Sequence, residues 1–166
     1  MHLRPVSPEP DWTVRINWSR PVTYENTIDE DYEYGYNQDH WLYMILGCHG
    51  ASPRKIFYIG KVYNSFVGNR LQQDDHRQRY QKLRKQHPNH RLRVSLGTVH
   101  IKDGHITKQR IDQIETMLIY TVGEKLQHII NRNKLWTVGI TDQYVIHNSG
   151  YHRPLPEVIQ QGIFIG

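Results

Sequence analysis

Short apolar stretches separated by polar intervals run along the whole chain, and their periodicity predicts a mixed α/β fold. Apolar side chains occupy every second position over residues 12–18, which is typical of a half-buried strand. Compact apolar runs at 41–47 and 56–62 predict two more strands, and the glycine, serine and proline between them predict a hairpin loop. Because this connection is short, we expect the two strands to pair antiparallel.

Two longer polar-rich segments show helical patterns, with a strand between them. Residues 68–87 predict a helix that ends before Pro88 and has few apolar positions and a basic remainder. Alternation over 91–101 predicts a third strand. Residues 107–122 predict a second helix, because apolar side chains recur at helical spacing and Thr107 is a suitable N-cap.

The two ends of the chain carry weaker patterns. A short helical turn is expected over 126–130, and residues 135–166 predict a C-terminal hairpin or extension. The chain therefore divides into an N-terminal extension (1–40) with an acidic, tyrosine-rich segment, a central unit (41–134) and a C-terminal extension (135–166). We interpret these parts as one domain with one core.

Composition narrows the class of protein without changing this picture. A hydrophobic fraction of 37% in 166 residues suits a foldable, soluble chain rather than a disordered one. No apolar run approaches the roughly 20 residues that a membrane span needs, and the N-terminus has no apolar signal region. Cys48 is the single cysteine, so an intrachain disulfide framework and a four-cysteine zinc site are excluded. These features predict a cytoplasmic protein, associated with the nucleoid if its source is prokaryotic.

Charge is unevenly distributed around the formal net charge of +5. Residues 25–39 are acidic, whereas residues 70–93 gather lysines, arginines and histidines. Clustered cations release counterions when they meet a nucleic-acid backbone. A solvated helix face gives the same pattern, and both interpretations stay open. The acidic segment is either an ordinary solvated loop or a cover for the basic stretch that moves away when nucleic acid binds.

The predicted hairpin and the helices after it carry side chains suited to phosphate chemistry. Tyr43 and Tyr58 lie in the two apolar runs, and Arg70 follows downstream. Arginine offers a fixed fork to phosphate oxygens, whereas a phenol with a free pKa of about 10 must be deprotonated by nearby positive charge or act as a proton relay. Glu115, at the edge of an apolar stripe, must be paired, hydrogen-bonded or metal-bound. A lone carboxylate of this kind suits Mg²⁺, which keeps several waters of its own.

In their order along the chain, these residues resemble the GIY-YIG nuclease family. Residues 41–43 stand where the first motif would lie, and Tyr58-Ile59-Gly60 matches the second motif. The arginine, histidine, glutamate and asparagine of the family correspond to Arg70, His76, Glu115 and Asn131, with Asn133 as the alternative asparagine. The resemblance covers about 41–134. The first motif lacks its glycine and isoleucine, and both the loop between the motifs and the gap to the arginine are longer than usual.

The resemblance implies an α+β fold with a small three-stranded antiparallel sheet flanked by helices. The N-terminal strand and the C-terminal hairpin would be additions to that unit. Tyr43 is implied to act as a general base or water-orienting group with support from Tyr58, and Arg70 is implied to stabilise the phosphate. Glu115 would bind one divalent ion, Mg²⁺ or Mn²⁺, while His76 and Asn131 complete the implied catalytic set.

The first functional hypothesis is a divalent-metal-dependent endonuclease that hydrolyses DNA phosphodiester bonds, restriction-like or associated with a phage or mobile element. Its expected partner is double-stranded DNA, and cleavage of both strands favours a homodimer. Basic residues expected to contact the nucleic acid are Lys61, Arg77, Arg79, Lys82, Arg84, Lys85, Arg132 and Lys134. The alternatives are a nucleic-acid-binding module that lost cleavage, a repair or recombination nuclease subunit, and a protein–protein adaptor that uses the acidic segment.

Overall fold

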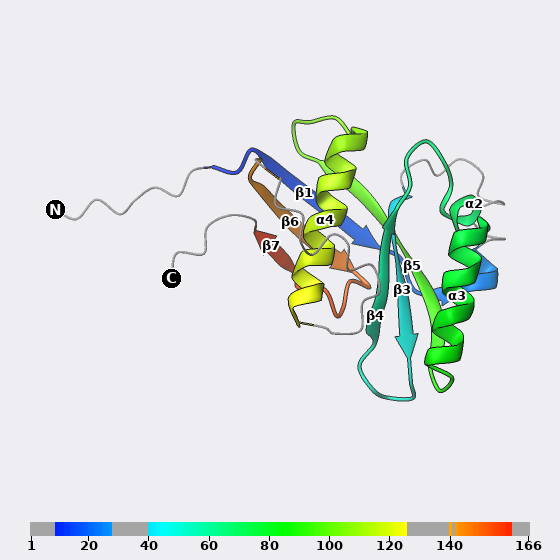
Figure 1. The fold of residues 1–166 in the computed structure, drawn as a ribbon. Helices are drawn as coiled ribbons and strands as arrows, with labels where there is room; N and C mark the ends of the chain where they lie inside the picture. Colours follow the sequence, from blue (N-terminus) through cyan, green and yellow to red (C-terminus); the bar gives the residue numbers. More distant parts are fainter. Residues whose placement is uncertain (1–8, 28–39, 126–139, 141, 161–166) are drawn as a thin grey trace.

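One curled sheet organises the fold and carries helices against it (Figure 1). The computed structural model describes residues 9–27, 40–125, 140 and 142–160. The elements in chain order are β1 (Trp12–Trp18), β2 (Val22–Thr23), β3 (His40–Cys48), β4 (Lys55–Lys61), α2 (Val67–Leu71), α3 (Asp74–Gln86), β5 (Arg91–Ile101), α4 (Lys108–Lys125), β6 (Tyr144–Gly150) and β7 (Val158–Gln160). Across these described residues, seven strands form the sheet in the order β4-β3-β5-β1-β6-β7, and β2 pairs with β5 off this path.

Strand β5 joins the two halves of the sheet. Its 11 residues pair antiparallel with β3 over Arg91–Thr98 and antiparallel with β1 over Gly97–Ile101. Strand β1 pairs on its other side with β6, and this pairing is parallel. The hairpin β3–β4 therefore ends one side of the sheet, with β4 as the edge strand, whereas the terminal segments of the chain build the other side.

The two halves of the sheet are buried differently, as their sequences require. In β1, Val14, Ile16 and Trp18 are buried and alternate with the exposed Arg15 and Asn17, which is typical of a strand with one covered face. Strand β3 is instead buried without alternation from Leu42 to Gly47. A continuous apolar run of this kind needs cover on both faces of the sheet.

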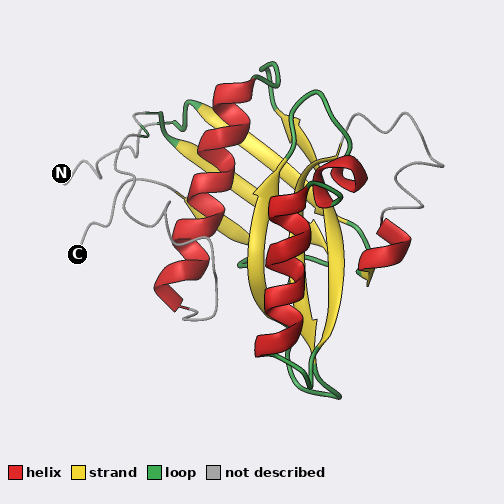
Figure 2. Cartoon of the chain, turned by 45° about the vertical axis from the view of Figure 1, so that its right-hand side comes forward, coloured by secondary structure: helices red, strands yellow, loops and turns green. Residues whose placement is uncertain are grey.

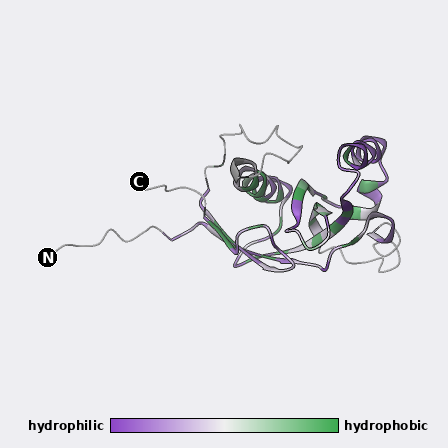
Figure 3. Cartoon of the chain, turned by 90° about the horizontal axis from the view of Figure 1, so that it is seen from below, coloured by the Kyte–Doolittle hydropathy of each residue, from purple (hydrophilic) through white to green (hydrophobic). Residues whose placement is uncertain are grey.

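Helices provide that cover from opposite sides. Leu42, Met44 and Leu46 of β3 join a hydrophobic cluster with α4, β1 and β6, while Tyr43 and Ile45 join a second cluster with α2 and α3. Figures 2 and 3 show α4 and the α2–α3 pair as separate helical layers against the sheet, with the β3–β4 hairpin between them. The edge strand β4 is therefore flanked by α3 on one side and by α4 on the other.

Several predicted elements are confirmed. Strand β5 has the predicted bounds, and a C-terminal hairpin forms by antiparallel pairing of β6 with β7. The hydroxyl of Thr107 accepts a hydrogen bond from the backbone N–H of Arg110 at 3.2 Å, which is the expected N-cap contact of α4. The helix predicted over 68–87 is divided at Gln72–Gln73 into α2 and α3, because Gln73 adopts an extended backbone.

The α+β class is confirmed, but the predicted three-stranded sheet is wrong. The strands treated as terminal additions are members of the same sheet, since β1 pairs with β5 and β6 pairs with β1. Local periodicity shows that a segment is a strand but not which distant strand it pairs with, and β5 is long enough to pair with β1 beyond β3. The helical turn expected over 126–130 lies outside the described residues. In the described ranges, no helix is both long and apolar enough to cross a bilayer.

Candidate functional site

Tyr43 and Tyr58 lie next to each other across the β3–β4 hairpin. Tyr43 pairs with Gly60 and Ile45 pairs with Tyr58, so the two phenols point to the same face of the sheet. Their ring centroids are 5.8 Å apart. The Tyr43 ring lies directly over Gly60, where any β-carbon would collide with the phenol. The glycine of the Tyr58-Ile59-Gly60 motif therefore makes room for the Tyr43 ring.

Helix α3 contributes His76 and Arg79 to the same face. The Tyr43 hydroxyl is 3.2 Å from Nδ1 of His76, and Nη1 of Arg79 is 3.0 Å from the same nitrogen. The Arg79 guanidinium also lies 4.6 Å from the centroid of the Tyr58 ring, in cation–π geometry. Arg79 therefore contacts both His76 and Tyr58.

The hydrogen bonds determine the tautomer of His76. Arginine has only donors, so Nδ1 of His76 must accept from Arg79 and the ring proton must sit on Nε2. Because Nδ1 has a single lone pair, the Tyr43 hydroxyl at 3.2 Å shares it with Arg79. Burial, followed by the charges of Arg70 and Arg79, lowers the pKa of His76 from 6.5 to about 4. Asp75 Oδ2 lies 3.4 Å from Nε2 and opposes this shift only in part. His76 is consequently neutral at neutral pH.

Both phenols also hold their protons more tightly than free tyrosine. Burial raises the pKa of Tyr43 well above 10, and the neighbouring Tyr58 raises it further, against the smaller opposing effects of Arg70 and Arg79. Burial likewise raises the pKa of Tyr58, where the charge of Arg79 opposes the shift and that of Glu115 adds to it. At neutral pH, Tyr43 is thus a protonated, fully buried phenol whose hydroxyl lies 3.2 Å from Nδ1 of His76.

Glu115 reaches the hairpin from α4. Its carboxylate is buried, with 7% of the side chain exposed, and Oε2 accepts a hydrogen bond from Nζ of Lys61 at 2.8 Å. Asp112, one turn earlier on α4, also pairs with Nζ of Lys61. Two carboxylates of one helix face therefore turn toward one cation on the edge strand.

Tyr58 connects the two sides of the edge strand electrostatically. The positive charge of Arg79 on α3 and the negative charge of Glu115 on α4 both shift its pKa. Arg70, on α2, acts on Tyr43, Tyr58 and His76 together, and its Nη1 donates to Oε1 of Gln73. Charges from three helices thus act on Tyr58, in the middle of β4.

Most of the predicted site residues gather around β4. Tyr43, Tyr58, Arg70, His76 and Glu115 share direct contacts or electrostatic interactions, whereas Asn131 and its alternative Asn133 lie outside the described residues. The predicted nucleic-acid contacts divide into two groups. Arg77, Lys82, Arg84 and Lys85 are exposed on α3.

The remaining predicted contacts do not share that open surface. Lys61 and Arg79 are built into the site itself, through Glu115 and through His76 and Tyr58. Arg132 and Lys134 lie outside the described residues, as does the acidic segment (25–39) from residue 28 onward. Sequence reasoning missed Asp112, although its position three residues before Glu115 places both acids on one side of a helix.

A metal site of three or more protein ligands is not present among the described residues, since no group of three histidine, cysteine or acidic side chains converges there. Glu115 and Asp112 make a smaller donor set of two carboxylates. Comparison with protein-family models, with curated proteins and with solved structures finds no match for this chain.

Proposed function

We propose that the protein is a divalent-metal-dependent endonuclease of the GIY-YIG type that hydrolyses DNA phosphodiester bonds. The observation that carries the proposal is the clustering of Tyr43, Tyr58, His76 and Glu115 around the edge strand β4. These residues are far apart in the sequence and were selected by their order along it. A packing role alone does not require an arginine, a histidine and two phenols to share hydrogen bonds and charge interactions.

In this proposal Tyr43 orients the attacking water. Its hydroxyl lies 3.2 Å from Nδ1 of His76, which would orient it, and its oxygen would accept a hydrogen bond from the water. The raised pKa of Tyr43 makes this role more favourable than that of a phenolate base. Arg70 supplies the cation for the phosphate oxygens. Arg79 adds to the burial and the Arg70 charge that keep His76 neutral, and it packs against the Tyr58 ring.

A hard divalent cation fits the carboxylate pair of α4. Glu115 and Asp112 already direct their oxygens at one ammonium nitrogen, that of Lys61, and oxygen donors of this type suit Mg²⁺ or Mn²⁺. Such an ion, when bound, would polarise a phosphoryl oxygen as a Lewis acid. Lys61 would have to leave the carboxylates and would then offer its charge to the nucleic acid.

Plasmid cleavage with Mg²⁺ tests the proposal. We expect the parent protein to nick supercoiled DNA and Glu115→Gln to reduce the rate by at least about 100-fold, because metal-assisted charge stabilisation is worth several kcal/mol. The matched control is Glu157→Gln, which removes the same charge from an exposed position beyond β6 and should cleave like the parent. Absence of nicking by the folded parent with any divalent ion tested would overturn the proposal.

The second candidate is a nucleic-acid-binding module on the same scaffold. It is favoured by the ion pairs of Lys61 with Glu115 and Asp112, which occupy the oxygens that a metal would need. In that case the parent and Glu115→Gln would bind DNA equally, and neither would nick it. A homodimer, a repair role and a preference for double-stranded DNA belong to the first proposal. The cleavage products bear on the dimer: linear DNA that forms in step with nicked circles would favour it.

A further inference from the structure

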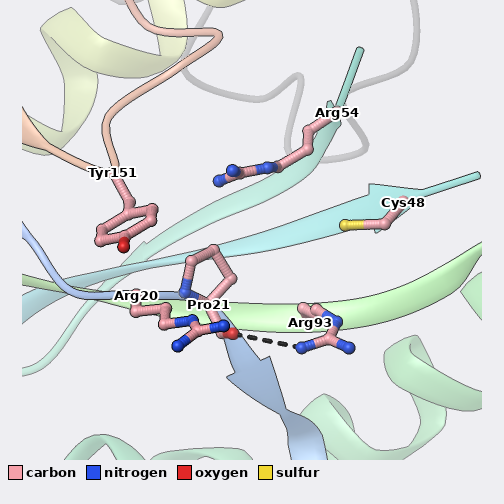
Figure 4. A pocket seen from close by; sticks show the side chains of 6 residues that line it. All are labelled: Arg20, Pro21, Cys48, Arg54, Arg93 and Tyr151. Atoms are coloured by element: carbon pink, nitrogen blue, oxygen red, sulfur yellow. Dashed lines mark hydrogen bonds between the residues drawn. The ribbon is translucent and has the colours of Figure 1, made fainter. Parts of the chain in front are cut away.

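An arginine-lined cavity lies away from the tyrosine site, at the opposite end of the hairpin (Figure 4). It has a volume of about 440 Å³ and is lined by Arg20, Pro21, Cys48, Arg54, Arg93 and Tyr151. Cys48 ends β3, five residues after Tyr43, so the cavity is separated from the phenol by about 17 Å of extended strand. The lining residues come from four separate segments of the chain, which the sheet brings together.

The cavity opens on the face of the sheet opposite α2 and α3. Arg93 pairs with Leu46, whose side chain belongs to the α4 cluster, so the Arg93 side chain points to that face. Figure 4 shows the guanidinium groups of Arg20 and Arg93 on either side of the Pro21 oxygen, and Arg54 and the Tyr151 ring on the remaining sides of the cavity. This face is distinct from the one that carries Tyr43 and His76.

The charge in this cavity is not balanced by the described residues. Its lining contains three guanidinium groups and no carboxylate, and no ion pair joins any of the three to an acid in the described ranges. Nη1 of Arg54 is buried and has no hydrogen-bond partner among them. Burying such a donor and holding like charges together both cost free energy, which a bound anion would offset.

Two further contacts position Arg93 and Arg54 without neutralising them. Nη1 of Arg93 donates to the backbone oxygen of Pro21 at 3.4 Å. The Arg54 guanidinium lies 5.9 Å from the centroid of the Tyr151 ring, and that tyrosine is 47% exposed. The cavity therefore combines several arginine forks with an exposed aromatic face, the pairing that proteins use for a phosphate and an adjacent base.

We propose that this cavity binds a phosphate group of a nucleotide unit, with Arg20, Arg54 and Arg93 on the phosphate and Tyr151 against the base. The volume falls within the range of small-ligand pockets and exceeds what one phosphate fills. The nucleotide is either free or part of a strand, and the same chemistry serves both sources. The site needs neither Glu115 nor Tyr43, so the test of phosphate binding is independent of the test of the proposed nuclease activity.

Binding measured by calorimetry without divalent metal tests the proposal, with inorganic phosphate, dAMP and a five-residue deoxyadenosine strand as probes. We expect Arg54→Gln to weaken the tightest of these at least tenfold, as the loss of a charge-assisted hydrogen bond would. The matched control, Arg15→Gln, removes an exposed arginine of β1 from outside the cavity and should change affinity less than twofold. Tyr151→Ala should weaken dAMP and the strand but not inorganic phosphate.

The probes also separate the two sources. Binding of dAMP as tight as that of the strand indicates a free nucleotide, whereas binding of the strand alone, lost in Arg54→Gln, indicates a backbone phosphate; either result supports the site. If Arg54→Gln does not fold, Arg20→Gln replaces it, since Arg20 is exposed. The proposal is overturned if none of the probes binds, or if Arg15→Gln weakens binding as much as the cavity variants do.

Discussion

Nδ1 of His76 has a single lone pair, and both the Arg79 guanidinium and the Tyr43 hydroxyl contact it. The Arg79 guanidinium donates to Nδ1 permanently, so protonation of that nitrogen would place two donors against each other. With a pKa of about 4, the imidazole is a fixed acceptor for the Tyr43 hydroxyl rather than a proton carrier at neutral pH. The imidazole can therefore hold the Tyr43 hydroxyl in one orientation.

The lowered pKa of His76 predicts a specific pH dependence of stability. Its pKa falls from 6.5 in the unfolded chain to about 4 in the folded one, so the unfolded state binds more protons between these values. Stability contributed by the neutral ring is therefore complete above pH 6.5 and is lost as the pH falls through the window, by about 3 kcal/mol in full. Urea unfolding at a series of pH values measures this slope.

His76→Gln isolates that contribution. The variant should unfold with a shallower decline in free energy between pH 6.5 and pH 4 than the parent, whereas replacing the exposed His105 by glutamine should leave the parent's slope. Equal slopes for the parent and His76→Gln would show that the ring is not held neutral.

Tyr43→Phe tests the water-orienting role at the level of one oxygen atom. The ring keeps its place over Gly60. The proposed acceptor for water is removed, so the proposed cleavage should fall by about 100-fold. Because the phenol stays protonated, the ratio of parent to variant rate should be constant from pH 6 to pH 9. A ratio that rises tenfold per pH unit would instead identify Tyr43 as a phenolate base. Tyr120→Phe, an exposed tyrosine of α4, is the control.

At the scale of elements, a buried asparagine fastens the C-terminal hairpin to β1. Oδ1 of Asn148 accepts from Nε1 of Trp18 at 3.0 Å, and Nδ2 donates to the backbone oxygen of Pro156 at 2.9 Å. The side chain is nearly inaccessible, with 2% exposed. The asparagine thus links the neighbouring strand to the turn that leads into β7.

Asn148→Ala should therefore lower the free energy of unfolding by about 1–3 kcal/mol, since it leaves a buried indole N–H and a carbonyl unpaired. Chemical unfolding followed by tryptophan fluorescence measures the loss. Ser149→Ala, at an exposed neighbouring position of β6, should cost less than half as much. Equal stability of Asn148→Ala and the parent would show that solvent reaches these groups.

The sequence predicted individual elements far better than their pairing. Alternation over β1 and β5 and the cap at Thr107 are local signals, and each is confirmed. The helix break at Gln72–Gln73 could not be predicted, because neither residue is a glycine or a proline. Parallel pairing of β1 with β6 depends on residues more than a hundred positions apart, and periodicity carries no information about partners at that distance.

The same limit applies to the candidate site. The order of residue types along the chain, which resembles that of a known family, was enough to predict Tyr43, Tyr58, His76 and Glu115. The structure brings these residues around one strand. Arg79 was predicted only as one cation among many, because charge along a helix does not show that one guanidinium turns inward onto Tyr58. The cavity arginines come from separate strands and loops, so no local pattern joined them.

At the scale of the whole molecule, the sheet makes the terminal segments part of the core. Strand β1 lies between β5 and β6. Its buried side chains belong to the same hydrophobic cluster as the buried side chains of α4. A fragment of residues 41–134 would expose that side of β5 and of α4 to water. We expect this fragment to lack a cooperative thermal transition, as followed by circular dichroism, whereas the full chain should have one. A sharp transition in the fragment would identify 41–134 as an independent domain.

The close approach of the Tyr43 ring to Gly60 has a consequence for any survey of sequence tolerance. In a library that samples every substitution and selects for activity, position 60 should be as intolerant as the reacting groups, although it has no side chain to react. Loss of function at this position would mean that the Tyr43 ring has been displaced. A ranking of positions by intolerance alone would therefore identify Gly60 as a residue with a chemical role, although it only leaves space for a ring.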